Sequence, residues 1–271
     1  DDKAGIAAII TAVEYIMSHK EIVHGEIKIA ITPDEEIGQG AKFLDLHKFG
    51  ANFAYTVDGG MTINKETFSA DTATIHVTGR NIHPGKAKGI MVNAIKVISA
   101  IIDRLPLHMS PETTQDYAPF LHPMDLTVSV SNATLKLILR DFLEEGLDAQ
   151  KHILEVIIAE VQKIYPVAKI QMEITESYRN MRKKLDENPL CLELLSAAVA
   201  KTGVAVDYAP IRGGTDGATL TALGLPTPNL FYGGENAHSL SEWVSVDIME
   251  KSMESIINII TLAVNHTSTH N

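Results

Sequence analysis

The chain has 271 residues, of which 45% are hydrophobic and 21% are charged, and its formal net charge is -11. This composition is typical of a globular protein with a sizeable core and excludes a disordered chain. No apolar run reaches the roughly 18 residues that a transmembrane helix needs, so we expect a soluble chain. The acidic balance, without a cluster of Lys and Arg, argues against nucleic acid or a membrane surface as a partner.

The chain contains a single cysteine, Cys191. One thiol cannot form an internal disulfide, and its use fits a reducing compartment, so we expect a cytoplasmic protein. Because one thiolate cannot form a metal site alone, we expect any metal ligands to be His, Asp and Glu side chains.

Helices and strands are predicted to alternate over residues 1–67. Apolar residues recur at helical spacing over residues 3–19, and Asp2 is the expected N-cap of that helix. Strands are predicted over residues 26–32 and 52–57, with a short helix over residues 41–47 between them. Alternating elements of this kind are typical of an α/β fold with a parallel sheet.

Residues 68–177 have a different pattern and are predicted to form an inserted α+β domain. Their elements follow the order β, α, β, β, α, β, which is that of a split-βαβ fold. The α/β pattern then resumes over residues 178–271, so the outer domain is predicted to have two parts, 1–67 and 178–271. The predicted strands of the insert are residues 73–78, 125–130, 135–139 and 170–175, and its helices are 91–104 and 148–165. In the last part we predict helices over 189–201, after Gly214 and over 247–264, and strands over 204–208 and 229–231.

Acidic motifs follow the predicted strands of the outer domain. Asp34-Glu35-Glu36 comes after the first strand and Asp58-Gly59-Gly60 after the second, while Asp1-Asp2 precedes a helix and so follows a further expected strand. Ligands of α/β sheets bind at the carboxyl ends of the strands, so we expect these motifs to converge. Clustered carboxylates raise one another's pKa unless a cation neutralises them, and a divalent metal is the simplest such cation. Each motif taken alone is equally consistent with a solvated acidic loop or a helix cap.

His238 lies in a glycine-rich loop after another predicted strand and is a candidate nitrogen ligand. Zinc, cobalt and manganese all accept mixed carboxylate and imidazole ligands. Glu35 and Glu36 are adjacent and point in different directions, so one can bind a metal while the other takes a proton from water.

Three further polar groups are candidates for a substrate cleft. Arg212 opens the glycine-rich turn Arg212–Gly217, which offers backbone N–H groups for an anion and a guanidinium for a carboxylate. The same turn is also consistent with a plain junction between a helix and a strand. His83 and Arg140 lie in the insert, at positions that would serve a cleft.

Six motifs together resemble the M20 metallopeptidase family, and among its members the aminopeptidases that act on tripeptides. The resemblance extends over all 271 residues in order and spacing. The motifs are Asp1-Asp2-Lys3-Ala4-Gly5, Thr32-Pro33-Asp34-Glu35-Glu36-Ile37-Gly38, Tyr55-Thr56-Val57-Asp58-Gly59-Gly60, Asn81-Ile82-His83-Pro84-Gly85, Arg212-Gly213-Gly214-Thr215-Asp216-Gly217 and the loop that ends at His238.

The resemblance implies a zinc-exopeptidase-like catalytic domain that carries a lid domain, with two Zn²⁺ ions, or Co²⁺ or Mn²⁺, in a complete site. It implies that Asp1 bridges both ions, that Glu36 and His238 bind one and that Asp58 binds the other. Aspartate at position 58 resembles the aminopeptidase branch rather than the deacylases. The implied catalytic residues are Glu35, as general base, and His83, which polarises the scissile carbonyl. The implied substrate-binding residues are Arg140, Arg212 and Asn93. The lid is a candidate surface for pairing two copies of the chain, and the sequence leaves the oligomeric state open.

The sequence departs from the family in one respect. Members carry a His-x-Asp motif upstream of the Asp-Asp-Lys segment, and none of the eleven histidines here is followed two residues later by aspartate. The sequence therefore resembles the C-terminal two-thirds of the enzyme, without its first strands. Two alternatives to the tripeptide aminopeptidase stay open: an amidohydrolase that deacylates N-acyl amino acids, and a noncatalytic fragment that only binds metal.

Overall fold

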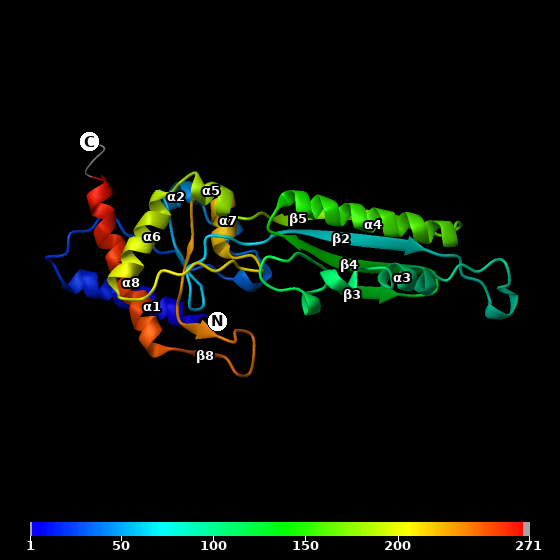
Figure 1. Cartoon of the computed structure of the whole chain (residues 1–271), viewed down its shortest axis with the longest axis horizontal. Coiled ribbons are helices and arrows are strands. Elements are labelled where there is room, and N and C mark those ends of the chain that lie inside the picture. The colour runs from blue at the N-terminus through cyan, green and yellow to red at the C-terminus, as the bar shows by residue number, and fades with distance from the viewer. Residues whose placement is uncertain (1, 268–271) are drawn as a thin grey trace. The chain divides into compact units, whose positions relative to one another are not determined.

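A computed structural model describes residues 2–267 of the chain, which fall into two compact units (Figure 1). The first unit contains the chain up to Thr67 and again from Asn180 onward, and the second unit is Phe68–Arg179. No helix in the described residues combines the length and the apolar character that crossing a membrane requires.

The second unit is built on a four-stranded antiparallel sheet (Figure 1). The strands lie in the order β3-β4-β2-β5, and the chain order of strands and long helices is the predicted β, α, β, β, α, β. The strands are β2 (Ser69–Thr78), β3 (Phe120–Val128), β4 (Asn132–Asp141) and β5 (Lys169–Tyr178), and the long helices are α3 (Ala94–Ile102) and α4 (Glu144–Ile164); short 3₁₀ helices η3 (Pro84–Lys86), η4 (Leu107–Met109) and η5 (Pro111–Thr113) lie in the loops.

Buried and partly buried residues alternate along β2 and β4, which explains why the sheet has one face covered by the core. Ala73, Ile75 and Val77 of β2 are buried, and the residues between them are only partly buried. Strand residues that alternate in this way place one set of side chains on the core face. Helix α4 contributes buried residues such as Leu147 and Leu154 to the same hydrophobic core. The second unit therefore has a core of its own.

Among the described residues, the regular elements of the first unit are mostly helices, and its strands are short. Helices α1 and α6 both pack against α8, while α7 contacts α5 and η2. Strands β1 and β6 pair in parallel, and β7 and β8 form a small antiparallel pair. The bounds are α1 (Lys3–Ser18), η1 (Glu35–Ile37), η2 (Ala41–Phe43), α2 (Leu46–Phe49), β1 (Thr56–Val57), α5 (Arg182–Asp186), α6 (Leu190–Lys201), α7 (Asp216–Ala222), β6 (Asn229–Leu230), β7 (Gly234–Glu235), β8 (Trp243–Val244) and α8 (Val246–Thr267).

Two predicted strands of the first unit are wrong. Residues 26–32 run extended but form no strand, because neither edge has a ladder partner among the described residues. Residues 204–208 form only an isolated bridge between Tyr208 and Ile63. A second isolated bridge joins Thr67 and Ile211, but no continuous ladder forms between the two bridges. Pro210 has no N–H to donate, and the carbonyl of Ala209 accepts from the side chain of Asn64 instead.

The predicted helix over residues 41–47 is also wrong in extent. It is replaced by η2 and α2, which are separated by Leu44 and Asp45. The Asp45 side chain accepts a hydrogen bond from the backbone N–H of Lys48. This N-cap starts a new helix instead of continuing the first.

Candidate active site

The site begins at the N-terminus of α1, next to the end of β1. Asp2 caps the helix by accepting a 2.9 Å hydrogen bond from the backbone N–H of Gly5. A Cβ at Gly5 would lie 2.5 Å from the carbonyl oxygen of Val57, so only glycine permits this approach. The other carboxylate oxygen of Asp2, Oδ2, is buried and has no hydrogen-bond partner among the described residues. Burial is the main cause that raises the pKa of Asp2 to about 6. Asp1, the expected bridging ligand, lies outside the described residues.

The adjacent glutamates lie in η1, which follows the extended segment 26–32. Asp34 precedes them in the left-handed region, with φ of 61°, and this turns the chain sharply. Glu36 Oε1 lies 3.0 Å from His238 Nε2. Two of the expected metal ligands, 202 positions apart in the chain, therefore come together.

Asp58 follows β1 and is held by the pairing of that strand with β6. Its backbone N–H donates to the carbonyl of Leu230 at 3.1 Å, and that of Gly59 donates to the same oxygen at 2.9 Å. Burial first, and then the negative charges of Glu35 and Asp2, raise the pKa of Asp58 to about 7. Its carboxyl group is thus only partly ionised near neutral pH.

Glu35, the expected base, belongs to the same acidic group. Burial raises its pKa most, and the charges of Asp216 and Glu36 raise it further. A hydrogen bond from the backbone N–H of Asp216 and the nearby His238 lower it by less. A carboxylate with a raised pKa holds a proton more readily at neutral pH, which suits a general base.

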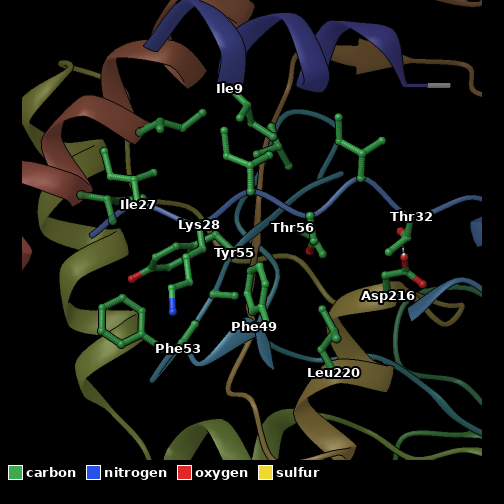
Figure 2. Close-up of a pocket in the computed structure, with 18 of the residues that line it drawn as sticks. Ile9, Ile27, Lys28, Thr32, Phe49, Phe53, Tyr55, Thr56, Asp216 and Leu220 are labelled. Atoms are coloured by element: carbon green, nitrogen blue, oxygen red, sulfur yellow. Dashed lines mark hydrogen bonds between the residues drawn. The ribbon is translucent and has the colours of Figure 1, made fainter. Parts of the chain in front are cut away.

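Sequence reasoning assigned no role to Asp216 and Thr32, which lie beside the base. The Thr32 hydroxyl donates a 2.7 Å hydrogen bond to Asp216 Oδ2, as Figure 2 shows. Asp216 is the first residue of α7 and is buried, with 9% of its surface exposed. One sequence signal was present: Asp216 directly follows the N-cap Thr215, and the first turn of a helix favours acidic residues.

The remaining predicted residues are divided between the units. Arg212 lies in the first unit, in the loop before α7. The other three lie in the second unit. His83 accepts from the backbone N–H of Gly85 at 3.1 Å, Asn93 caps α3, and the Arg140 guanidinium lies 5.6 Å from the ring centroid of Phe120. Their catalytic and substrate-binding roles stay predictions.

The donor set of the first unit fits a divalent cation chemically. Half-buried carboxylates with raised pKa, the unpartnered Oδ2 of Asp2 and the pairing of Glu36 with His238 are what a site for a cation presents. The described residues contain no group of three His, Cys, Asp or Glu side chains close enough to hold an ion together. Within the described part, Glu36 and His238 contact each other, and Asp1 lies outside it.

Comparison with known proteins identifies the family. Residues 1–262 match the peptidase family M20/M25/M40. The chain is 44% identical over 264 residues to Peptidase T of Clostridium perfringens and 45% identical over 264 residues to Peptidase T of Geobacillus kaustophilus. These matches cover 97% of the chain but only 65% and 64% of the two relatives, so the chain spans less than two thirds of their length.

Solved structures show the same fold. A tripeptidase from Staphylococcus aureus matches with a TM-score of 0.83 at 21% identity, over 98% of this chain and 71% of that one. An aminopeptidase from Bacillus cereus matches with a TM-score of 0.78 at 23% identity, over 97% of this chain and 71% of that one. The predicted α/β fold with an α+β insert is confirmed. The chain belongs to the peptidase family M20/M25/M40.

Proposed function

We propose that the chain carries the active site of a metal-dependent aminopeptidase that removes the N-terminal residue of tripeptides. The observation that carries this proposal is the convergence of Glu35, Asp58 and the Glu36–His238 pair at one edge of the first unit. The relatives named Peptidase T, and the tripeptidase and aminopeptidase among the solved structures, support the choice of substrate.

Two Zn²⁺ ions, or Co²⁺ or Mn²⁺, fit the carboxylate and imidazole donors. Glu36 and His238 would hold one ion, Asp58 would hold the other, and Asp1 would bridge them. When bound, the ions supply Lewis-acid chemistry and a lowered pKa for water. They would also neutralise the carboxylates whose mutual repulsion raises the pKa of Asp58.

Glu35 would act as the general base. It is half-buried, it faces the other carboxylates, and the backbone N–H of Asp216 fixes its position. In this role it accepts the proton of the attacking water and passes it to the leaving amine. Its neighbour Glu36 is engaged by His238 and is not available for proton transfer.

The other predicted residues would bind and polarise the peptide. His83 would donate a hydrogen bond to the scissile carbonyl. Arg212 or Arg140 would bind the free carboxylate at the C-terminus of the tripeptide, because a guanidinium makes paired hydrogen bonds with a carboxylate. Asn93 would line the same cleft, and the second unit would act as the lid.

Exchange of each glutamate for glutamine tests the assignment of the site. Glu35→Gln should keep the metal content and lower kcat by at least about 100-fold, the usual scale of general-base catalysis. Glu36→Gln should lose metal. Metal content is measured by elemental analysis. For kcat, the chain is mixed with a second polypeptide, namely the part of the Clostridium perfringens relative that lies outside the match. Equal metal loss in both variants would refute the division of roles.

A comparison of two classes of substrate distinguishes the proposed aminopeptidase from its alternatives. Free tripeptides and N-acetyl amino acids are compared at equal concentration with the same preparation. Preferential cleavage of tripeptides supports the aminopeptidase. Preferential cleavage of the N-acetyl compounds would make the protein a deacylase, and turnover of neither with full metal occupancy would make it a noncatalytic metal-binding chain.

A further inference from the structure

Asn229, the first residue of β6, is a fully buried residue at the junction of several segments. Its backbone lies opposite Thr56 of β1 along one edge of β6. Along the other edge it exchanges two backbone hydrogen bonds with Asn64, of 2.9 and 3.0 Å. The side chain of Asn229 is thus enclosed by the protein, where a polar group normally needs hydrogen-bond partners.

The side-chain oxygen of Asn229, Oδ1, accepts hydrogen bonds from two other elements. The Thr56 hydroxyl donates to it at 2.7 Å from β1, and the Thr215 hydroxyl donates to it at 3.4 Å from the start of α7. Gly217 permits this approach, because a Cβ at that position would lie only 2.5 Å from Asn229 Oδ1. One oxygen atom therefore joins β1, β6 and the first turn of α7.

Two of the joined elements carry acidic residues of the candidate site. Asp58 lies two residues beyond Thr56, and its backbone N–H donates to β6. Asp216 directly follows Thr215, the N-cap of α7, and its backbone N–H donates to the Glu35 carboxylate. Thr56 and Asp216 line the same pocket (Figure 2). The position of Glu35 relative to Asp58 therefore depends on how β1 and α7 are held together.

The backbone alone gives little to hold these elements together. The ladder between β1 and β6 has only two residue pairs, Thr56↔Asn229 and Val57↔Leu230. Helix α7 is seven residues long, and the N–H groups in the first turn of a helix have no acceptor within the helix. The arrangement of β1 and α7 therefore depends on side-chain contacts, and the Asn229 amide makes one with each of them.

A second observation indicates that Asn229 serves position rather than stability. Its Nδ2 atom is buried and has no hydrogen-bond partner among the residues that the structure describes. Leu230 and Phe231, which follow it, are buried apolar residues. A half-satisfied buried amide costs stability compared with an apolar side chain of similar shape. Proteins keep such a group where it fixes one arrangement of a functional site.

We propose that Asn229 is a positioning residue that sets the general base Glu35 relative to Asp58, by holding β1 and the start of α7 on one oxygen atom. Because Asn229 is fully buried, it acts through other residues. It reaches Glu35 through the backbone N–H of Asp216, and it reaches Asp58 through β1. This inference rests on the proposed function only for its effect on turnover.

Hydrogen exchange of the metal-free chain tests the positioning directly. Asn229→Leu keeps the approximate shape of the side chain and removes the oxygen that two hydroxyls share. The amides of Asp58 and Asp216 should then exchange at least about 10-fold faster, because their hydrogen bonds are no longer held in place. Val199→Ala is the matched control, since Val199 is buried in the core that contains Leu230. It should lower stability in urea and leave the two amides at the rates of the parent chain.

Two variants of Thr56 test whether the link runs through the amide. Thr56→Val removes the donor on β1, so it should also accelerate exchange of the Asp216 amide on α7. Thr56→Ser keeps the donor and should keep the exchange rate of the parent chain. Faster exchange in β1 without a change at Asp216 would overturn the proposal, because the two contacts would then be independent. This pair decides the question even if Asn229→Leu does not fold.

Turnover separates this inference from the proposed function. The chain is mixed with the part of the Clostridium perfringens relative that lies outside the match. Asn229→Leu should lower kcat at least about 10-fold, because a misplaced base is a poor one. KM should stay within about twofold, and metal content should not change. Val199→Ala should keep kcat within about twofold of the parent chain.

The outcomes distinguish the two claims. Equal losses of kcat in Asn229→Leu and Val199→Ala would make Asn229 a structural residue and overturn the inference. Parent-like exchange or parent-like kcat in Asn229→Leu would also overturn it, while the proposed function stands. If the parent mixture cleaves no tripeptide, the proposed function fails, and the exchange rates of the Asp216 amide still decide the positioning.

Discussion

At the scale of single residues, the hydrogen bond between Thr32 and Asp216 gives a clear prediction. Asp216 is buried, and the Thr32 hydroxyl donates to it at 2.7 Å. Thr32→Val keeps the shape of the side chain but removes the donor, so it should lower the free energy of unfolding by about 1–3 kcal/mol. Thr32→Ser keeps the hydroxyl and is the control. Urea titration measures both, and equal losses would show that the methyl group matters rather than the hydrogen bond.

The raised pKa values of the acidic residues predict a pH dependence of stability. The pKa of Asp58 is about 7 in the folded chain, against 3.8 ordinarily, so ionisation costs more in the folded state than in the unfolded one. Without metal, stability should be greatest below pH 4 for this group and fall as pH rises through 7, by at most about 4 kcal/mol.

Thermal unfolding at several pH values measures this effect. Asp58→Asn removes the ionisable group and should flatten the decline between about pH 4 and pH 7. Zn²⁺ should also flatten it, because a bound cation neutralises the carboxylate. A decline that is as steep in Asp58→Asn as in the parent chain would assign it to other groups.

The sequence identified part of this site and missed the rest for a physical reason. Glu36 and His238 were recognised as ligand types in loops after predicted strands, and they lie 3.0 Å apart. Asp216 and Thr32 carry no such signal, because the hydrogen bond between them spans 184 positions and depends on how α7 packs. Ligand chemistry is visible in a sequence, whereas the support of a ligand depends on tertiary contacts.

At the scale of elements, the alternation of apolar and polar residues predicted strands well only where a neighbouring segment was present to pair with them. Strands β2 and β4 show alternating burial and pair along their whole length. Residues 26–32 have an equally strong strand composition but no ladder partner among the residues that the structure describes, and they form no strand. Composition indicates that a segment can pair, but the ladder itself is made by two segments.

The start of α7 gives a prediction at this scale. A Cβ at Gly217 would lie 2.5 Å from Asn229 Oδ1 and 2.6 Å from the carbonyl oxygen of Thr227, so the helix approaches β6 closely. Gly217→Ala should therefore lower the free energy of unfolding by about 1–3 kcal/mol, the usual cost of overpacking. Gly25→Ala is the control, because nothing lies within 4 Å of its added Cβ. Urea titration that finds equal effects would refute the close approach.

At the scale of the whole molecule, the second unit should fold by itself. Its core is formed by residues of its own sheet and helices, such as Ile75, Leu137 and Leu154. Near its chain ends, Arg179 donates to Asp71 at 2.8 Å, an ion pair within the unit. A fragment of residues 68–179 should unfold cooperatively in urea, and Leu154→Ala should destabilise it by about 2–5 kcal/mol. A broad, noncooperative transition would show that the unit needs the rest of the chain.

The last prediction concerns how many metal ions the chain holds. Asp1, Glu36 and His238 would give one ion three protein ligands, the number found in catalytic zinc sites with an open position. The other ion would have Asp58 and the shared Asp1 only. Two carboxylates make a poor zinc site, so the chain should bind one ion tightly and the second weakly.

With one tight ion, the chain by itself should also be almost inactive toward tripeptides, because the second Lewis acid stabilises the reacting groups. Equilibrium dialysis with elemental analysis measures the stoichiometry, and Glu36→Gln should remove the tight ion while Asp58→Asn leaves it. Two tightly held ions per chain, or full turnover, would show that another residue completes the second site. His83→Ala tests whether this histidine of the second unit is a ligand. Loss of metal rather than turnover would make His83 a ligand, and unchanged metal with lower turnover would support its proposed role toward the substrate carbonyl.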